Sequence, residues 1–323
     1  MKKIALIALT TLCIAFFALS LGAVHVSNIW SSIFGFDFAS TALNDQIIWQ
    51  IRAPRILGAL IIGISLGIAG ALAQGSTNNP LADPAFLGTT AGASLGVIIG
   101  VLTGIVDVAS VGAIACAAIG AMAATALTFS MARSAFQLII IGIALSASLS
   151  AVAGIAISIA ERPEIRSITF WSLGSLSLLT WNELLPLVVI SFGGLYAATR
   201  ISAQVDLLSL GDPAVRHIGR NPQRIRLFAF MIFSILVAVS VSTVGTISFL
   251  ALAAPHIARI LVGPRHRTLV VASAVIGAGI LLIADTAARS IAPPQDLPIG
   301  LLIALIAAPV LIVVLKKGQL QWR

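Results

Sequence analysis

The residues of this chain that could do chemistry are few and far apart. Its four histidines, His25, His217, His256 and His266, include no two at the spacing of metal ligands. No Ser/His/Asp set and no pair of carboxylates falls in one neighbourhood, as nucleophilic or acid–base catalysis would need. The nucleotide-binding pattern G-x-x-x-x-G-K-[S/T] does not occur. We therefore predict no catalytic residue, no metal site and no cofactor in this chain.

The most polar stretch is ISAQVDLLSLGDPAVRHIGRNPQRIR, residues 201–226, which separates two long apolar regions. Its Gly211-Asp212-Pro213 turn leads into a short amphipathic run, and Gly219 and Asn221-Pro222 follow that run as stop signals. This pattern predicts a small helix lying across one face of the molecule. Two interpretations remain open: a solvated basic loop, or a docking surface for a soluble partner.

The composition requires a membrane body around that stretch. The chain has 323 residues, of which 59% are hydrophobic and 9% charged, and its mean hydropathy is +1.09. Soluble domains are about 25% charged, so a soluble core is excluded. The net charge of +8 needs no nucleic acid, because Lys and Arg concentrate at cytoplasmic membrane edges. The fold class predicted is an all-α polytopic membrane protein.

The apolar runs leave room for about ten spans of ~20 residues each, in one permease domain over residues 1–323. We interpret the first run as a retained helix rather than a cleaved signal peptide, because nine more spans follow. We expect external segments at 26–54 and near 161, and a short external turn at APPQDLP. Seven of the expected spans, numbers 1, 2, 5, 6, 7, 9 and 10, cover about 4–25, 56–74, 136–159, 183–200, 227–246, 268–289 and 298–315. Span 3 reaches about 105 and span 4 about 131. Span 8 is short and broken and ends near 263.

The basic residues orient this bundle. With both termini in the cytoplasm, 14 of the 19 Lys and Arg residues fall inside, as the positive-inside bias requires. The five that remain outside are Arg52, Arg55, Arg162, Arg166 and Arg289.

The two halves of the chain suggest an inverted repeat of spans 2–5 and 7–10. Each four-span unit opens with a long helix and then a junction broken by proline, at Pro80 and Pro84 in the first unit and at Pro255 in the second. Such interruptions in oppositely oriented halves are typical of transporters. The glycines Gly58, Gly63, Gly67 and Gly70 of span 2 would also allow close helix packing.

The chain lacks an obvious energy source. Asp285 is the only plausible coupling carboxylate, and with Arg289 at i+4 it is most simply a structural pair. A permease driven by a separate ATPase is therefore favoured. The alternatives are an ion-coupled secondary transporter or exporter that acts without an ATPase, and a membrane scaffold.

Six blocks of sequence, in order and over nearly the whole chain, resemble the iron-siderophore, haem and cobalamin permease family of bacterial ABC importers. The blocks are RAPR at 52–55, GALAQGSTNNPLADPAFLGTTAGA at 70–93, FWSLGSL at 170–176, GDPAVRHIGRNPQRIR at 211–226, GTISFLALAAPHIARILVGPRHR at 245–267 and ADTAARSIAPPQDLPIGLLIALIAAP at 284–309.

The resemblance implies a ten-span subunit of the bacterial cytoplasmic membrane that pairs with an identical or a different permease. Two cytoplasmic ATPase subunits would bind the ATP and Mg²⁺, and an extracytoplasmic binding protein would deliver the cargo. It implies binding-protein docking by Arg52, Arg55 and Arg289. It places ATPase coupling in the 201–226 loop, at Leu210, Gly211, Asp212, Ala214, Arg216 and Gly219.

The resemblance also implies a translocation pathway lined by spans 5, 8 and 10. The residues expected there are Ser146, Ser150, Pro255, His256 and Pro309. Asp296 stands where the family usually has a glutamate before Pro298. The cargo expected first is a ferric siderophore, followed by haem and cobalamin.

Overall fold

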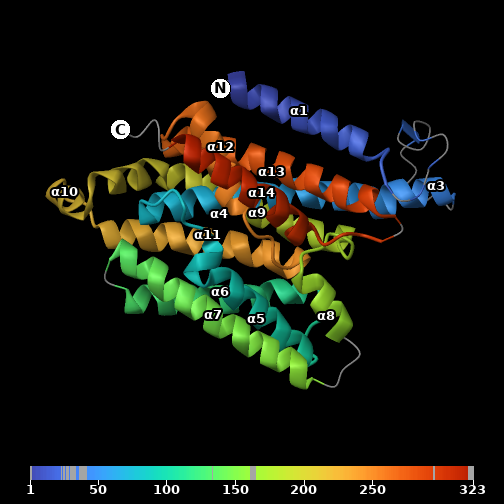
Figure 1. Cartoon of the computed structure of the whole chain (residues 1–323), viewed down its shortest axis with the longest axis horizontal. Helices are drawn as coiled ribbons and strands as arrows, with labels where there is room; N and C mark the ends of the chain where they lie inside the picture. Colours follow the sequence, from blue (N-terminus) through green and yellow to red (C-terminus); the bar gives the residue numbers. More distant parts are fainter. Residues whose placement is uncertain are drawn as a thin grey trace.

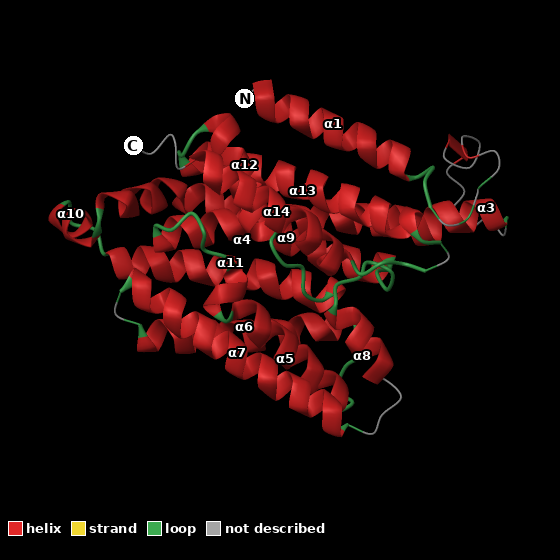
Figure 2. Cartoon of the chain, viewed as in Figure 1, coloured by secondary structure: helices red, strands yellow, loops and turns green. Residues whose placement is uncertain are grey.

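The structure is a computed structural model that describes residues 2–22, 24, 26, 29, 34–35, 42–132, 134–160, 165–293 and 295–318. Regular structure in these ranges is entirely helical (Figure 2). The first half contains α1 (Lys2–Ala18), α3 (Leu43–Gln46), the π-helix η1 (Ile47–Arg52), α4 (Ala53–Thr77), the 3-10 helix η2 (Pro84–Leu87), α5 (Thr89–Leu102), α6 (Val111–Met131) and α7 (Ala135–Ile159). The second half contains α8 (Ile165–Ser172), α9 (Trp181–Leu207), the 3-10 helix η3 (Leu208–Leu210), α10 (Asp212–His217), α11 (Pro222–Val244), α12 (Leu250–Val262), α13 (His266–Ile291) and α14 (Ile299–Gly318). Of the sequence predictions, His25, Arg162, the start of the external segment near 161 and most of residues 26–41 fall outside the described residues.

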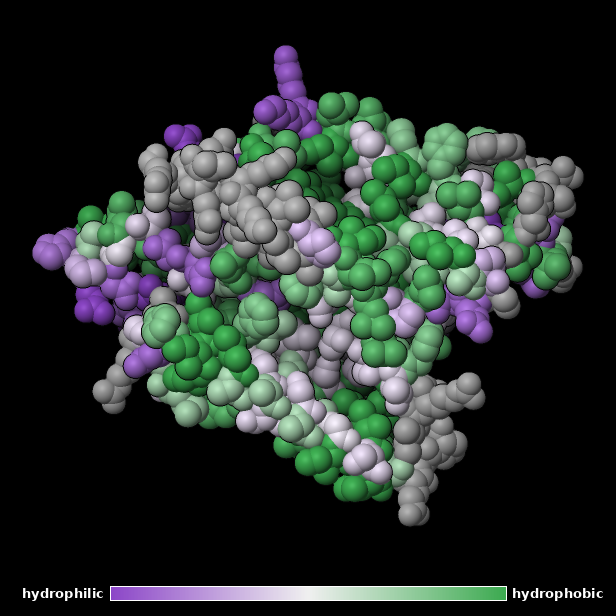
Figure 3. All heavy atoms as spheres, viewed as in Figure 1, coloured by the Kyte–Doolittle hydropathy of each residue, from purple (hydrophilic) through white to green (hydrophobic). Residues whose placement is uncertain are grey.

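The long helices lie roughly side by side, with α10 at one end of the bundle and α3 and α8 at the other (Figure 1). Hydrophobic atoms dominate the surface between the two ends (Figure 3). Six helical stretches of the described chain are long and apolar enough to cross a membrane: Leu43–Thr77, Val111–Met131, Phe136–Ile159, Trp181–Leu210, Pro222–Val244 and His266–Ile291. Together with the shorter apolar helices, they confirm an all-helical membrane protein.

Several helices extend beyond the predicted spans. The segment predicted as external at 26–54 is helical from Leu43 onward, because α3, η1 and α4 run on without a break. Pro54 does not interrupt them. It lies directly after the π-helix η1, where the helical hydrogen-bond pattern is already altered. Similarly, residues 201–207 complete α9 and residues 222–226 begin α11. The irregular part of the predicted 201–226 loop is therefore shorter than the sequence indicated.

Helix α4 is the centre of the bundle and packs against α13, α11, α9 and α12. Its glycines allow neighbouring backbones to approach closely, as their spacing predicted. A Cβ atom at Gly63 would lie 2.4 Å from the carbonyl oxygen of Gly277, and one at Gly67 would lie 2.1 Å from that of Ser273. In a bilayer, the hydrophobic effect contributes little to the association of helices, because the lipid is as apolar as their side chains. Close packing of this kind is therefore a principal source of their association.

The predicted break after span 2 is an irregular segment that is exposed at Asn78, Pro80 and Leu81 and buried at 82–84. Asn78, in the left-handed conformation with φ 50°, ends α4. The Asp83 carboxylate then accepts a hydrogen bond from Ala85 N at 2.8 Å and caps η2. Ser146 Oγ of α7 donates to Ala85 O at 2.7 Å. Irregular backbone within a membrane protein is tolerated where protein groups satisfy it in this way.

The corresponding break in the second half lies earlier than predicted. Pro255 is inside a continuous α12, and the irregular backbone is at 245–249, where Gly245 and Phe249 have φ of 73° and 64°. A Cβ at Gly245 would lie 1.8 Å from Trp171 O. Contact with the α8 region therefore fixes this break, and a glycine is required there.

We predict that Gly67→Ala destabilises the permease by about 1–3 kcal/mol, the usual cost of overpacking. Gly193→Ala is the matched control, because no atom lies within 4 Å of a Cβ placed there on α9. The measurement is the thermal unfolding midpoint of each purified variant in lipid nanodiscs. Equal midpoints for the two variants would contradict the role given to the α4–α13 contact.

Candidate functional site

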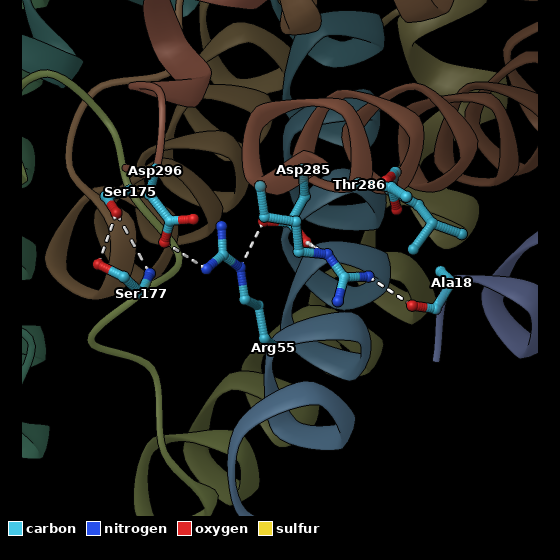
Figure 4. Close-up of polar contacts among 9 residues, drawn as sticks. Ala18, Arg55, Ser175, Ser177, Asp285, Thr286 and Asp296 are labelled. Carbon is cyan, nitrogen blue, oxygen red and sulfur yellow. Dashed lines mark hydrogen bonds and ion pairs between the residues drawn. The ribbon is translucent and has the colours of Figure 1, made fainter. Parts of the chain in front are cut away.

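A cluster of charged side chains lies where α4 begins and α13 ends, and Arg55 is at its centre (Figure 4). Arg55 Nε donates to Asp285 Oδ1 at 2.7 Å, and Arg55 Nη1 donates to Asp296 Oδ2 at 2.6 Å. The side chains of Arg55 and Asp285 are 8% and 0% exposed, whereas that of Asp296 is 25% exposed. Asp296 is therefore the outermost member of the cluster.

Arg289 and Arg52 connect the cluster to the end of α1. Arg289 Nε lies 3.6 Å from Asp285 Oδ2, which confirms the i,i+4 pair predicted from the sequence. Arg289 Nη2 donates to Ala18 O at 2.7 Å. Arg52 donates from Nη1 to Leu19 O at 2.6 Å and from Nη2 to the carbonyl of Val24.

The structure thus brings together the three arginines that were predicted to dock a binding protein. All three are buried in the isolated chain, with residue exposures of 4% for Arg52, 7% for Arg55 and 4% for Arg289. The sequence analysis missed the pairing of Arg55 with Asp285 and Asp296. The available signal was the predicted topology, because the spans expected from the sequence place 52–55, 285–289 and 296 at the same end of the bundle.

At the opposite end, Arg226 attaches α10 to the bundle. Its Nη1 and Nη2 donate to the two carboxylate oxygens of Asp212 at 2.9 and 2.7 Å, and its Nε donates to Ser76 O at 3.0 Å. The Ser76 carbonyl belongs to the last turn of α4, which has no later helical N–H to bond. A buried guanidinium therefore joins α10 directly to the end of the central helix.

A second contact ties this end to α13. Asp206 Oδ1 accepts from the backbone N of His266 at 3.0 Å and lies 2.6 Å from His266 Nδ1. Asp206 is near the end of α9 and His266 is the first residue of α13. The two short helices η3 and α10 are thus connected to both α4 and α13.

The predicted coupling residues gather on η3 and α10 and just beyond them. Gly211 and Gly219 have φ of 84° and 75°, which glycine adopts without strain. Leu210 and Ile218 are 59% and 54% exposed at the end of the bundle where hydrophilic atoms collect (Figure 3). Arg216 is also exposed, whereas Ala214 and Asp212 are half-buried. Apolar side chains exposed among charges are typical of a protein-binding surface.

The residues predicted for the pathway do not meet within one chain. Ser146 and Ser150 lie on α7, where Ser150 is exposed, and Pro255 and His256 lie on α12. Figure 1 shows α7 and α12 on opposite sides of α4 and α11. Pro309 is exposed on α14.

The comparison with protein-family models decides the family. The FecCD transport family model matches residues 7–317, which is nearly the entire chain. This chain belongs to the FecCD transport family.

Two relatives and one solved structure show how this member compares. It is 34% identical over 307 residues to the iron(3+)-hydroxamate import system permease protein FhuB of Bacillus subtilis (strain 168), covering 93% of this chain and 79% of FhuB. It is 31% identical over 280 residues to the hemin transport system permease protein HmuU of Yersinia pestis, covering 84% of each. An inward-facing metal-chelate type ABC transporter matches with a TM-score of 0.87 and 29% identity, over 98% of this chain and 99% of that one.

The FecCD assignment confirms the resemblance drawn from the six sequence blocks. It also confirms that the chain is a non-catalytic membrane permease of the ABC importer type, with ATP hydrolysis belonging to a separate subunit.

We predict a pH dependence from the Asp212–Arg226 pair. The hydrogen bonds from Arg226 hold the pKa of the Asp212 carboxyl below its usual value, although partial burial opposes them. The pair therefore stabilises the folded state above the unfolded pKa of about 3.9, and this stability is lost as the pH falls through the lowered folded pKa. Hydrogen exchange of residues 208–221, corrected for intrinsic rates, should show constant protection from about pH 8 to 5 and a loss below about pH 4.

Asp212→Asn should abolish the acidic loss of protection and weaken protection already at neutral pH. Asp107→Asn, which removes an exposed carboxylate from the turn between α5 and α6, is the control and should behave as wild type. An unchanged acidic transition in Asp212→Asn would show that another group controls this loop.

Proposed function

We propose that this FecCD permease is the membrane-spanning subunit of an ABC importer that carries an iron chelate from an extracytoplasmic binding protein into the cytoplasm. The observation that carries the proposal is the surface of η3 and α10. It exposes Leu210 and Ile218 beside Arg216, and Arg226 fixes it to the central helix. A surface that is both exposed and rigidly attached to α4 suits an ATPase subunit whose movement must be transmitted to the membrane helices.

The proposed topology has ten spans with both termini in the cytoplasm of a bacterial inner membrane. Adding α1, α5, α12 and α14 to the six longer candidates supports this number. Lys3 Nζ donates to Leu261 O at 3.3 Å, so the N-terminal helix begins beside the end of α12 that leads into α13 and the Asp206 contact. This arrangement supports an N-terminus on the same side as α10.

An inverted repeat of spans 2–5 and 7–10 is part of the same proposal. The packing of the helices supports it, because α4 contacts α13 and α12 just as α11 contacts α6 and α5. Each unit also has a short second helix after an irregular segment, α5 in the first and α12 in the second.

The proposed assembly contains a second permease chain, identical or different, two ATPase subunits that bind ATP and Mg²⁺, and the binding protein. The separation of the pathway residues Ser146, Ser150, Pro255, His256 and Pro309 supports a pathway shared between two permeases. The chain itself is proposed to hold no cofactor. The binding protein would dock at the end that contains Arg52, Arg55 and Arg289, where charge complementarity would speed encounter and weaken with salt.

The cargo proposed first is a ferric siderophore, with haem and cobalamin next. The hydroxamate and hemin relatives support this chemical class, because both are named for iron chelates. The exposed small residues of α7, such as Ser150, would offer a mildly polar surface to a bulky ligand.

The test is capture of soluble partners by the permease in nanodiscs, with ATPase activity measured on the captured material. Wild type should recover an ATPase. Leu210→Asp with Ile218→Asp should reduce that recovery at least tenfold, because two carboxylates would have to be desolvated in the contact.

Ile105→Asp provides the matched control. Ile105 is 75% exposed in the turn between α5 and α6, away from α10, so its substitution should leave ATPase recovery unchanged. Failure of wild type to recover an ATPase, together with chelate uptake driven by an ion gradient alone, would replace the importer proposal with a secondary transporter.

A further inference from the structure

A groove with an apolar lining lies between α5, α6 and α7, three helices on the side of the bundle away from α1 (Figure 1). It encloses about 400 Å³. The described residues that line it are glycine, alanine, leucine and isoleucine, together with Cys116. Ile99 and Ile119 in this lining are 50% and 71% exposed, so the groove opens to the surface of the bundle.

Backbone atoms form the floor of the groove, because α5 and α6 pack together through glycines. A Cβ atom at Gly96 would lie 2.2 Å from the carbonyl oxygen of Cys116, and one at Gly120 would lie 2.1 Å from that of Gly92. All four residues belong to the lining of the groove. The glycines carry no side chain, so the space above them is a consequence of the backbone packing.

Helix α7 forms one wall of the groove, and its packing changes along its length. A Cβ atom at Gly142 would lie 2.3 Å from Phe86 O, so the first half of α7 is held tightly against η2. Leu145 and Leu149 then line the groove. Beyond them, a Cβ atom at Gly154 would meet no atom within 4 Å. The groove therefore lies where the tight packing of α7 against the bundle ends.

The dimensions of the groove match those of a hydrocarbon chain. Its lining on α6 runs from Cys116 to Leu127, which is about 16 Å along the helix axis at ~1.5 Å per residue. The hydrocarbon core of a bilayer is ~30 Å thick, so the groove is about as long as one leaflet is thick. Over this length, a helix about 10 Å in diameter would need about three times the volume of the groove. A single acyl chain is narrow enough to enter it.

The chemistry of the lining also favours an apolar ligand. A water molecule held in a protein needs about two to four polar partners, and the side chains of the described lining offer only the Cys116 thiol. Apolar atoms along the walls gain dispersion contacts with each side chain that they touch. In a membrane, the apolar atoms at hand are those of the acyl chains, which also cover the hydrophobic surface around the groove (Figure 3).

We propose that one acyl chain of a membrane phospholipid occupies this groove as a specifically bound ligand. It lies between the α5–α6 pair and α7, and it supplies packing where α7 leaves the bundle beyond Leu149. This inference goes beyond the proposed function, because it requires only the membrane environment and neither an ATPase nor a cargo. Since α7 also carries Ser146 and Ser150, the bound chain stabilises the helix that presents two of the residues proposed for the pathway.

The first test uses a photoreactive lipid as the probe. The permease is placed in nanodiscs of phosphatidylethanolamine and phosphatidylglycerol that contain a small fraction of phosphatidylcholine with a diazirine on one acyl chain. After illumination, the cross-linked residues are mapped by mass spectrometry. Labelling per residue should be several-fold higher in the groove than on the exposed apolar face of α1, where Leu6, Leu9 and Leu12 are 65%, 60% and 60% exposed. Equal labelling of the two surfaces would indicate ordinary surrounding lipid and overturn the proposal.

Ala123→Phe should fill the groove, because Ala123 belongs to its lining and is exposed. Labelling of the groove in this variant should fall to the level of α1. Ala115→Phe is the matched control, since Ala115 is also exposed on α6 but lies outside the lining, and it should be labelled as wild type is. Unchanged labelling in Ala123→Phe, or an equal loss in Ala115→Phe, would count against a site in the groove.

Thermal unfolding in detergent gives a measurement that does not depend on cross-linking. Added phosphatidylglycerol should raise the unfolding midpoint of the delipidated wild type and of Ala115→Phe. Ala123→Phe should begin at a higher midpoint and respond less, because the phenyl ring takes the place of the acyl chain. Ala123→Leu repeats the measurement if Ala123→Phe does not fold. An equal response of all variants, or cross-linking of the groove to a second permease in place of lipid, would exclude the bound chain.

Discussion

The close approach of α4 to α13 is the contact on which the rest of this permease depends. Gly63 and Gly67 on one helix face Gly277 and Ser273 on the other, so that their backbones meet without intervening side chains. In a bilayer, such packing replaces the hydrophobic drive that water would supply. Because α4 also contacts α9, α11 and α12, any change in its position would alter the packing of most of the bundle.

Both ends of this packed pair carry ionic contacts. At the beginning of α4, Arg55 meets Asp285 of α13, and at its end the Ser76 carbonyl meets Arg226, which also holds Asp212. The cost of leaving one member of a buried pair unpaired is about 3–5 kcal/mol, so these contacts fix where the helix ends lie. A rigid pair with a polar site at each end offers a mechanical connection between the arginine cluster around Arg55 and α10.

The two ends differ in a way that suits different partners. The surface around α10 is exposed, with Leu210 and Ile218 open to contact. A partner at the α10 end can bind by covering the surface as it stands. At the other end, Arg52, Arg55 and Arg289 are buried, and their guanidinium groups already bond within the chain.

The sequence by itself determined the membrane environment, the all-helical class, the family blocks and a short helix after Gly211, although the structure begins that helix at Asp212, inside the predicted turn. These features follow from hydropathy, capping residues and turn glycines, which act over a few residues and can be recognised locally. It also indicated the glycines of α4 and the Asp285–Arg289 pair, because both depend on spacing within one helix.

Only the tertiary structure decided which charges meet. Arg55 lies 230 residues before Asp285 and 241 before Asp296, and Arg226 reaches a carbonyl 150 residues earlier at Ser76. The helix packing alone brings these groups together, and it also placed the second break at 245–249 rather than at Pro255. A long-range ion pair has no local signal, because its geometry is a consequence of every helix that packs between its two residues.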